Sequence, residues 1–469
     1  MSAPVRDTGA GAVLATVSLA TFVALMNYTA PMLTLPGMTA SFGTGVSGQA
    51  WLLNGIALGL AALLLVAGSL ADDYGRKRVF VAGTAVLAVT VALGAAASST
   101  LTFTLARIAQ GGASAAIVAS SLGLLAQAYP QGPARVRAMG VWGAALSGGI
   151  ATGPVASAAL GALDWRVGYA LYAVAALVLA AVSARTLTES RSPRPGRPDL
   201  LGAVVLGLAL TALLAALTVG RDGWLRPAVG ELLGATAVLL AAFVAIERRV
   251  SAPMLDLGLF RRPAFLAATS SALFTGLGVI GMFSYFPALL QQAMGMSELG
   301  TAWLLCLWSG VALLVALQAK RLPERFSARH QLALGFVLSA LGALTMLGAM
   351  SSGSWVRTLP GWLVAGVGSG LLNAAMPRAA VESVPPDRAS MGSGANNTAR
   401  YIGSSMGLSL TIVVATSAGS GHGGDSARAL AHGADHALLV GVALMLAGAV
   451  GALAFRERRT ARTRAVAVR

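Results

Sequence analysis

The stretch GSLADDYGRKR, residues 68–78, lies between two long apolar stretches. Residues 51–71 and residues 79–106 contain no charged side chain, whereas five of the seven residues from Asp72 to Arg78 are charged. A short charged turn between two apolar stretches, each long enough to cross a bilayer, is typical of two consecutive membrane helices. The sequence therefore predicts a polytopic membrane protein with a tight cytoplasmic turn at this position.

The composition of the whole chain agrees with a membrane-embedded fold. Of its 469 residues, 56% are hydrophobic and 11% are charged, whereas a soluble domain has about 25% charged residues. The net charge of +16 would suit a nucleic-acid-binding protein, but most basic residues fall in the segments on one side of the predicted helices. This is the positive-inside distribution of an integral membrane protein, so we expect no nucleic-acid partner.

Apolar stretches of about 20 residues predict fourteen transmembrane helices. The predicted ranges are 12–36, 47–70, 79–98, 101–128, 138–161, 167–187, 200–220, 228–247, 264–289, 299–318, 331–350, 359–380, 394–417 and 435–455. An even number of crossings leaves both termini on one side, and the basic residues of 456–469 indicate the cytoplasm. We therefore expect a multi-pass plasma-membrane protein with both termini cytoplasmic.

Two basic, proline-containing linkers, 186–199 and 247–263, divide these helices into groups of six, two and six. The division predicts an N-terminal six-helix bundle (1–190), a linker with two transmembrane helices (191–262) and a C-terminal six-helix bundle with a basic tail (263–469). Two bundles of equal size and orientation indicate a parallel internal repeat. Residues 317–329 weakly resemble the charged turn, at the place in the second bundle where such a repeat would put it.

The residues of the charged turn suit a specific role in addition to setting topology. Gly68 and Gly75 allow close approach of the main chain, and Asp72 can face the positive N-terminal end of a neighbouring helix. Arg76 and Lys77 can pair with carboxylates or lie among anionic lipid headgroups. The alternative is a solvated turn without a further role.

This turn resembles the loop signature of the major facilitator superfamily, Gly-x-Leu-Ala-Asp-x-x-Gly-Arg-Lys. The stretch from Gly68 to Lys77 departs from the usual pattern at Asp73, where the family mostly has a basic residue. The resemblance implies an all-helical transporter in which Gly68, Asp72, Gly75, Arg76 and Lys77 control the change of conformation. We expect no cofactor and no catalytic residue.

The fourth predicted helix carries Arg107 and, one turn further, Gln110. A charged side chain inside a membrane helix is costly unless it faces a partner or water. Snorkelling to the interface is the alternative, because Arg107 lies near the predicted extracellular end. Arg followed by Gln-Gly at this spacing resembles the superfamily's fourth-helix motif, which implies that Arg107 takes part in a proton or charge relay.

The fifth predicted helix contains Pro154, which predicts a kink. Gly149 and Gly153 form a small-residue face that we expect to let the facing bundle approach. The pattern resembles the antiporter signature Gly-x-x-x-Gly-Pro-x-x-Gly-Gly, with Ser157 and Ala158 at the last two glycines, and this resemblance implies export. A kinked packing helix without a further role is the alternative.

The thirteenth predicted helix carries Arg400, in a stretch that resembles the 14-span drug:H⁺ antiporter branch of the same superfamily. That branch usually has an aspartate in the first helix, nine residues before a Leu-Pro pair, where this chain has Asn27. None of the 17 acidic residues falls at mid-membrane in the predicted topology. Proton-coupled transport normally uses a protonatable group there, and a cavity with arginines but no carboxylate predicts a neutral or anionic substrate.

We interpret the chain as a secondary active exporter of a small amphipathic compound, a drug or natural product, that works as a monomer with protons as the expected coupling ion. Polar and aromatic residues within the predicted helices are the candidates for the substrate cavity: Asn27, Asn54, Gln110, Tyr285, Gln291, Trp308, Asn373, Asn397 and Arg400. The alternatives are a membrane-embedded enzyme or flippase acting on lipid-linked substrates, and a non-transporting receptor. An enzyme would need a constellation of His, Asp or Glu at membrane depth, which the predicted topology lacks.

A metal site is the remaining chemical alternative. His432 and His436 are four residues apart and would chelate a metal from one helical turn. A polar, glycine-rich loop is the simpler interpretation, so we expect no metal. The single cysteine, Cys306, excludes an intramolecular disulfide.

Overall fold

The computed structural model describes residues 8–44, 46–130, 132–160, 164–191, 199–220, 223–250, 253, 255–318, 327–417 and 426–454. These residues form helices and connections, with no strand among them. The N-terminal half contains α1 (Thr8–Thr29), α2 (Pro31–Phe42), α3 (Val46–Tyr74), α4 (Arg76–Ala95), α5 (Thr100–Ala128), α6 (Pro133–Leu160), α7 (Trp165–Thr186), α8 (Leu200–Val219) and α9 (Pro227–Glu247). The C-terminal half contains α10 (Pro263–Phe274), α11 (Gly281–Met294), α12 (Glu298–Gln318), α13 (Ala328–Thr345), α14 (Leu359–Glu382), α15 (Ala389–Ser417) and α16 (Ser426–Ala454).

Eleven helical stretches among the described residues are long and apolar enough to cross a membrane. Each of the fourteen predicted ranges overlaps a helix, so the all-α class is confirmed, while the number of crossings stays a prediction. The first predicted range is divided between α1 and α2 at Ala30, because Pro31 has no N–H to continue the hydrogen bonding of α1. The ninth runs without a break through α10, a π-helical segment at Thr275–Ile280 and α11.

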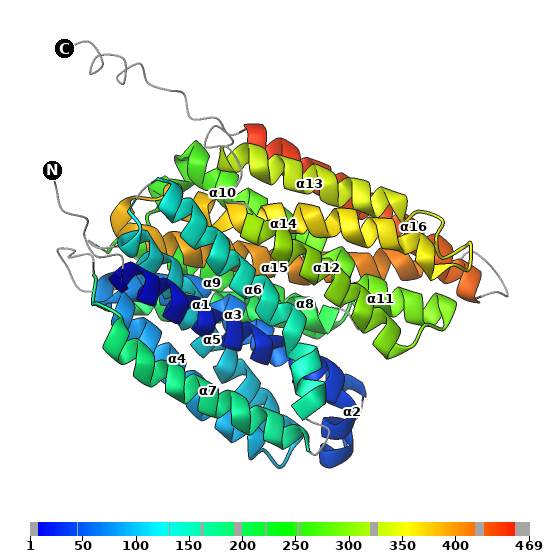
Figure 1. Cartoon of the computed structure of the whole chain (residues 1–469), viewed down its shortest axis with the longest axis horizontal. Helices are drawn as coiled ribbons and strands as arrows, with labels where there is room; N and C mark the ends of the chain where they lie inside the picture. Colours follow the sequence, from blue (N-terminus) through cyan, green and yellow to red (C-terminus); the bar gives the residue numbers. More distant parts are fainter. Residues whose placement is uncertain are drawn as a thin grey trace, which may run out of the picture.

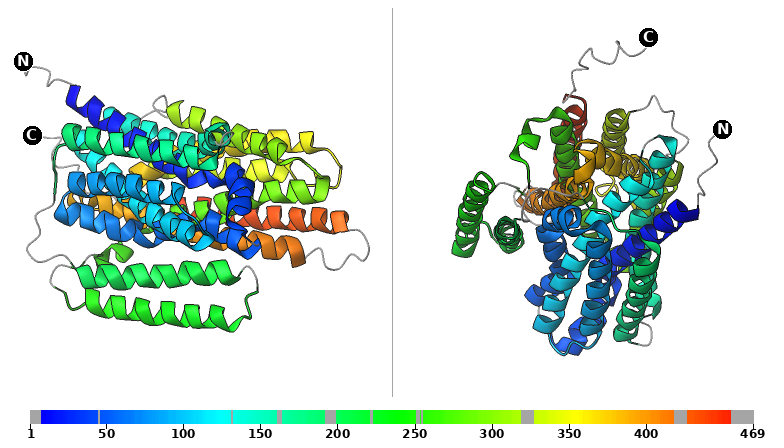
Figure 2. Two further views of the ribbon diagram at one scale, coloured as in Figure 1. Left: turned by 90° about the horizontal axis from the view of Figure 1, so that it is seen from below. Right: turned by 90° about the vertical axis from the view of Figure 1, so that its left-hand side faces the viewer.

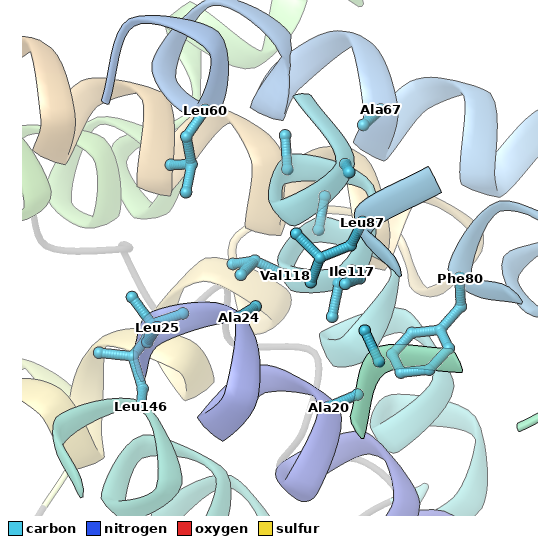
Figure 3. Packing of buried hydrophobic residues seen from close by; sticks show 14 of the residues in the cluster. Ala20, Ala24, Leu25, Leu60, Ala67, Phe80, Leu87, Ile117, Val118 and Leu146 are labelled. Carbon is cyan, nitrogen blue, oxygen red and sulfur yellow. The ribbon is translucent and has the colours of Figure 1, made fainter. Parts of the chain in front are cut away.

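Two large hydrophobic cores hold the helices together. The first is built from α1 to α7, with Val381 and Ala389 added from the C-terminal half. Figure 3 shows part of this core, where side chains such as Leu60 and Val118 from neighbouring helices point toward one another. The second core is built from α10 to α16, between Ala272 and Ala452. Burial of these side chains fixes which helix faces meet, because close packing gives the attraction between helices in lipid.

The pair α8 and α9 lies beside the two cores rather than within them (Figure 2). A smaller cluster of buried residues joins this pair to α3, α10 and α15, and the Ser409 hydroxyl donates to the main-chain oxygen of Leu217 at 3.4 Å. Only 17% of the most apolar part of α9 is buried within the protein. Its remaining apolar surface therefore faces lipid, as expected of a peripheral membrane helix.

The first turn of α1 and the last turn of α16 lie at the same end of the molecule (Figure 1). The even number of crossings expected from the sequence would place them this way. The segment that weakly resembles the charged turn, residues 317–329, falls largely on residues 319–326, which lie outside the described residues.

Candidate functional site

The charged turn lies against the N-terminal end of α15. Asp72 accepts hydrogen bonds from the main-chain N–H groups of Met391 at 2.8 Å and Ser390 at 3.3 Å. It also forms an ion pair with Arg76 at 2.9 Å, and these two side chains are 0% and 8% exposed. The predicted contact of Asp72 with the positive end of a neighbouring helix is therefore present. It joins the first helical core to a helix of the second.

Further contacts at this end bring the same segments together. Arg76 donates to the main-chain oxygens of Pro386 and Asp387, both at 3.4 Å. Asp73, the residue that departs from the family pattern, pairs with Arg388 at 3.2 Å. We call this group of contacts between residues 72–76 and 386–391 the end latch. Because its central ion pair is buried, loss of one partner leaves an uncompensated charge.

Two glycines of the turn have specific neighbours. Gly68 lies against the main chain of Ser390, where a Cβ would overlap the carbonyl oxygen. Gly75 has φ +127°, a conformation that favours glycine, and a Cβ there would lie 2.6 Å from a carboxylate oxygen of Glu189. Both positions therefore require the absence of a side chain.

Glu189 is a residue of this site that the sequence patterns do not single out. Its two carboxylate oxygens accept hydrogen bonds from the main-chain N–H groups of Lys77 at 3.1 Å and Arg78 at 3.2 Å. It thereby caps the start of α4 from the segment that follows α7. Lys77, predicted to act through its charge, takes part here through its main chain, and its side chain has no ion pair among the described residues.

Arg107 lies beside the C-terminal end of α1, where the chain passes from α1 into α2. Its guanidinium donates to the main-chain oxygens of Asn27 at 2.7 Å and Tyr28 at 2.9 Å, and to the side-chain oxygen of Gln110 at 3.1 Å. Asn27 and Arg107 are both 0% exposed. Snorkelling to the interface is therefore excluded for Arg107. Its charge compensates the negative C-terminal end of α1.

The break at Pro31 explains this contact. A residue without an N–H at position 31 leaves the carbonyl of Asn27 without its helical donor, and Arg107 supplies one. The amides of Asn27 and Gln110 extend the network, since Asn27 donates to Gln110 at 3.1 Å and Gln110 donates to the main-chain oxygen of Thr90 at 3.0 Å. These three side chains support one another and lie away from the pocket described below.

The helix α6, which contains Pro154, meets the same end of α1. Pro154 leaves the carbonyl of Ile150 without a helical donor, and the Thr29 hydroxyl donates to this carbonyl at 3.1 Å. A Cβ at Gly149 or Gly153 would overlap main-chain atoms of α1. The expectation that this glycine face meets the facing bundle is therefore wrong, because the face packs on α1 within the same core.

The contact of α6 with the second core is made by other residues. A Cβ at Gly143 would lie 2.6 Å from the main-chain oxygen of Asn373 in α14, and Asn373 donates to the Ser147 hydroxyl at 2.9 Å. Cys306 of α12 donates to the main-chain oxygen of Ala151 at 3.8 Å. The spacing of glycines along α6 alone does not tell which face meets which helix.

A small pocket lies where these helices meet, and we call it the seam pocket. Its wall is formed on one side by Leu122, Trp142 and Leu146 of α5 and α6, and on the other by Asn373, Asn397 and Arg400 of α14 and α15. Arg400 is 6% exposed and its Nε atom has no hydrogen-bond partner. The structure thus brings three of the predicted cavity residues together, and it adds Trp142 and Asn396, which were not predicted.

The remaining predicted cavity residues lie elsewhere. Gln291 donates to the Thr301 hydroxyl at 2.7 Å, and Trp308 stacks on Phe283 with ring centroids 5.4 Å apart. Tyr285 also packs against the second core, so none of the three lines the seam pocket. The side chain of Asn54 lies outside the described residues.

The described residues contain no group of three potential metal ligands. His436 contacts the main-chain oxygen of His432 at 2.8 Å, which is a contact within one helical turn. His422 and Asp425, from the same predicted loop, lie outside the described residues.

The helical fold, its two cores and the polar pocket at their seam define a multi-pass membrane transporter. The chain belongs to the Major Facilitator Superfamily, whose family model matches residues 17–408. The resemblance seen in the charged turn is therefore confirmed across most of the chain. Members of this family are transporters, which confirms that the protein is not an enzyme.

Two curated relatives and one solved structure show the extent of the similarity. The multidrug resistance protein Stp of Mycobacterium tuberculosis is 32% identical over 80% of this chain and 70% of its own length. The puromycin resistance protein pur8 of Streptomyces alboniger is 30% identical over 95% of this chain and 91% of its own length. The crystal structure of the human organic anion transporter MFSD10 covers 96% of this chain and 100% of its own, with a TM-score of 0.67 and 18% identity, which shows a shared fold.

Proposed function

We propose that the protein is a secondary active exporter of small amphipathic drugs or natural products. The seam pocket carries this proposal, because it combines apolar and polar walls from the helices of both cores and lies in a chain whose relatives are named for drug and antibiotic resistance. Pockets with mostly apolar walls and a few polar groups are typical of small-molecule sites. Cephamycin, the antibiotic in the name of another relative that is 30% identical over 89% of this chain, is a first candidate substrate.

Transport would proceed by alternating access. In this proposal residues 1–190 and 263–469 form two six-helix bundles that rock about the seam pocket, and residues 191–262 contribute α8 and α9 as the linker. The end latch ties residues 72–76 of the first bundle to α15 of the second. It has to break for the pocket to open at that end, so the latch stabilises one of the two states.

The direction and the coupling belong to the same proposal. We infer fourteen crossings with both termini in the cytoplasm, which puts the end latch at the cytoplasmic end. Protons are the expected coupling ion, although Asn27 replaces the acid of related exporters, and the working unit is a monomer. Arg107, held at the break of α1, is the proposed charge relay.

Inside-out membrane vesicles test the proposal. Vesicles with the protein are expected to accumulate a radiolabelled cephamycin when energised, and Asp72→Asn vesicles are expected to lose this uptake. Arg249→Gln, at an exposed residue of the linker, is the control and should behave as the wild type. A pH electrode in the same assay reports whether protons move with the substrate. Uptake no higher than in empty vesicles, for a panel of antibiotics and by well-folded protein, would refute export.

A further inference from the structure

We propose that the exported substrate carries an anionic group, and that Arg400 binds this group in the seam pocket. The inference rests on the proposed function and names the chemical class of its substrate: an amphipathic organic anion. Three features carry it, namely the absence of an acidic partner for Arg400 among the described residues, the charge of the residues around it and the apolar opposite wall.

Arg400 has no anionic partner within the described part of the chain. It is 6% exposed, its Nε atom has no hydrogen-bond partner, and no ion pair within the described residues involves it. Its guanidinium carbon lies 5.4 Å from the centre of the Tyr401 ring, and the Tyr401 side chain also hydrogen-bonds with Arg400, but neither contact supplies the negative charge of a carboxylate. A buried guanidinium without a counter-charge is a strong site for a carboxylate or sulfonate, which it binds through two parallel hydrogen bonds.

The second buried arginine, Arg107, also has an Nε atom without a hydrogen-bond partner, but its other guanidinium nitrogens are bonded. Arg107 donates to two main-chain oxygens at the end of α1 and to Gln110, and it does not line the seam pocket. Its charge is therefore matched by the negative end of a helix. Arg400 sits in the middle of α15, where the main chain offers no such free acceptors.

The acidic residues nearest to membrane depth do not face Arg400. Glu382 pairs with Arg378 at 4.0 Å with a side chain that is 53% exposed. Asp164 accepts a hydrogen bond from the main-chain N–H of Arg166 at the start of α7, and Glu231 is exposed on α9. The described residues that line the seam pocket, Arg400 apart, are uncharged. A cation entering this pocket would meet an uncompensated positive charge, whereas an anion would neutralise it.

The rest of the wall indicates the shape of the substrate. Leu122, Trp142 and Leu146 offer an apolar surface opposite Arg400. The amide of Asn373, now bonded to Ser147 of the other core, becomes a free donor once the bundles rock apart. A substrate with an aromatic or apolar body and one anionic group matches this arrangement.

Three compounds of one size test the charge directly: 1-naphthylacetate, 1-naphthylacetamide and 1-naphthylmethyltrimethylammonium. Binding to the purified wild-type protein is measured by titration calorimetry in lipid nanodiscs. The anion is expected to bind about tenfold more tightly than the amide, and the cation more weakly than both. Arg400→Gln should abolish the preference for the anion over the amide. Arg400→Lys should retain part of the preference for the anion, because lysine keeps the positive charge but cannot form the two parallel hydrogen bonds of a guanidinium.

The controls separate this inference from the proposed function. Arg249→Gln removes a positive charge far from the pocket and should leave the preference unchanged, and a single symmetrical peak in size-exclusion chromatography shows that each variant is folded. Tight binding of the cation, an anion preference that survives Arg400→Gln, or no binding of any of the three compounds overturns the inference, even if a cephamycin is exported. Anion binding that depends on Arg400, in a protein whose vesicles take up no compound, supports the site and refutes export.

Discussion

The guanidinium of Arg107 lies 2.7 Å from the main-chain oxygen of Asn27, a carbonyl that loses its helical donor because residue 31 is proline. A charge inside the membrane is thus matched by the open end of a helix rather than by an acid. The same principle recurs nearby, where Thr29 donates to the carbonyl that Pro154 leaves free on α6. Two prolines and two donors therefore fix how α1, α5 and α6 meet.

This relationship predicts a coupling between Arg107 and Pro31. Arg107→Gln is expected to lower the free energy of unfolding by about 2 kcal/mol or more, because buried acceptors lose a charged donor. In a Pro31→Ala background the loss should be about 1 kcal/mol smaller, since the new N–H can bond to the Asn27 carbonyl. Denaturant unfolding of all four proteins in detergent measures the difference. An equal loss in both backgrounds would contradict the explanation.

Asp72→Asn is expected to abolish transport while leaving the protein folded. The substitution leaves Arg76 buried without its carboxylate, which destabilises the latched state by about 3–5 kcal/mol and favours the state in which residues 72–76 and α15 are apart. Spin labels at positions 74 and 387, which are exposed beside the latch, should move apart. Arg185→Gln, at an exposed position on α7, is the matched control. Unchanged label distances together with normal transport would rule out the latch.

Gly75→Val tests the same turn by a different physical effect. The backbone at position 75 has φ +127°, and a side chain there would press on Glu189. Transport should fall at least about tenfold, because the contacts of the end latch between residues 72–76 and 386–391 can no longer form. Vesicle uptake gives the readout, and wild-type uptake would show that the turn tolerates a side chain.

Gly153→Ala is expected to slow substrate exchange and to allow a passive leak of substrate, because the added methyl group meets the main chain of α1 at Met26 and displaces α6 near Pro154. Counterflow and passive efflux from preloaded proteoliposomes measure the two effects. Gly234→Ala on α9, where a Cβ meets no atom within 4 Å, is the matched control and should be neutral. The prediction fails if both alanine variants behave alike.

Glu189→Ala should lower the stability by about 1 kcal/mol, the usual loss for a helix cap, because the first N–H groups of α4 lose their acceptor. Glu189→Gln keeps an oxygen in place and should remain closer to the wild type. Thermal unfolding in detergent distinguishes the two variants. A melting temperature of Glu189→Ala equal to that of the wild type would show that the cap contributes nothing.

The helical fold follows from the sequence because a bilayer offers no hydrogen-bond partner to the main chain. A long apolar stretch has to satisfy its own N–H and C=O groups, and a helix does so locally. The same local reasoning gives the tight turn at Gly75 and places Asp72 at a helix end. These features depend on residues that are close together in the chain.

Tertiary structure alone decided which partners these residues meet. The sequence presents Arg107 and Arg400 as two equivalent arginines inside membrane helices. In the structure Arg107 is bound by main-chain carbonyls of α1, whereas Arg400 lines a pocket whose other described residues are uncharged. Gly153 packs on α1 rather than on the facing bundle, and Glu189 reaches α4 from more than a hundred residues away. The physical reason is that the acceptors and surfaces concerned are largely main-chain atoms, which every residue carries, so only the packing of the helices selects among them.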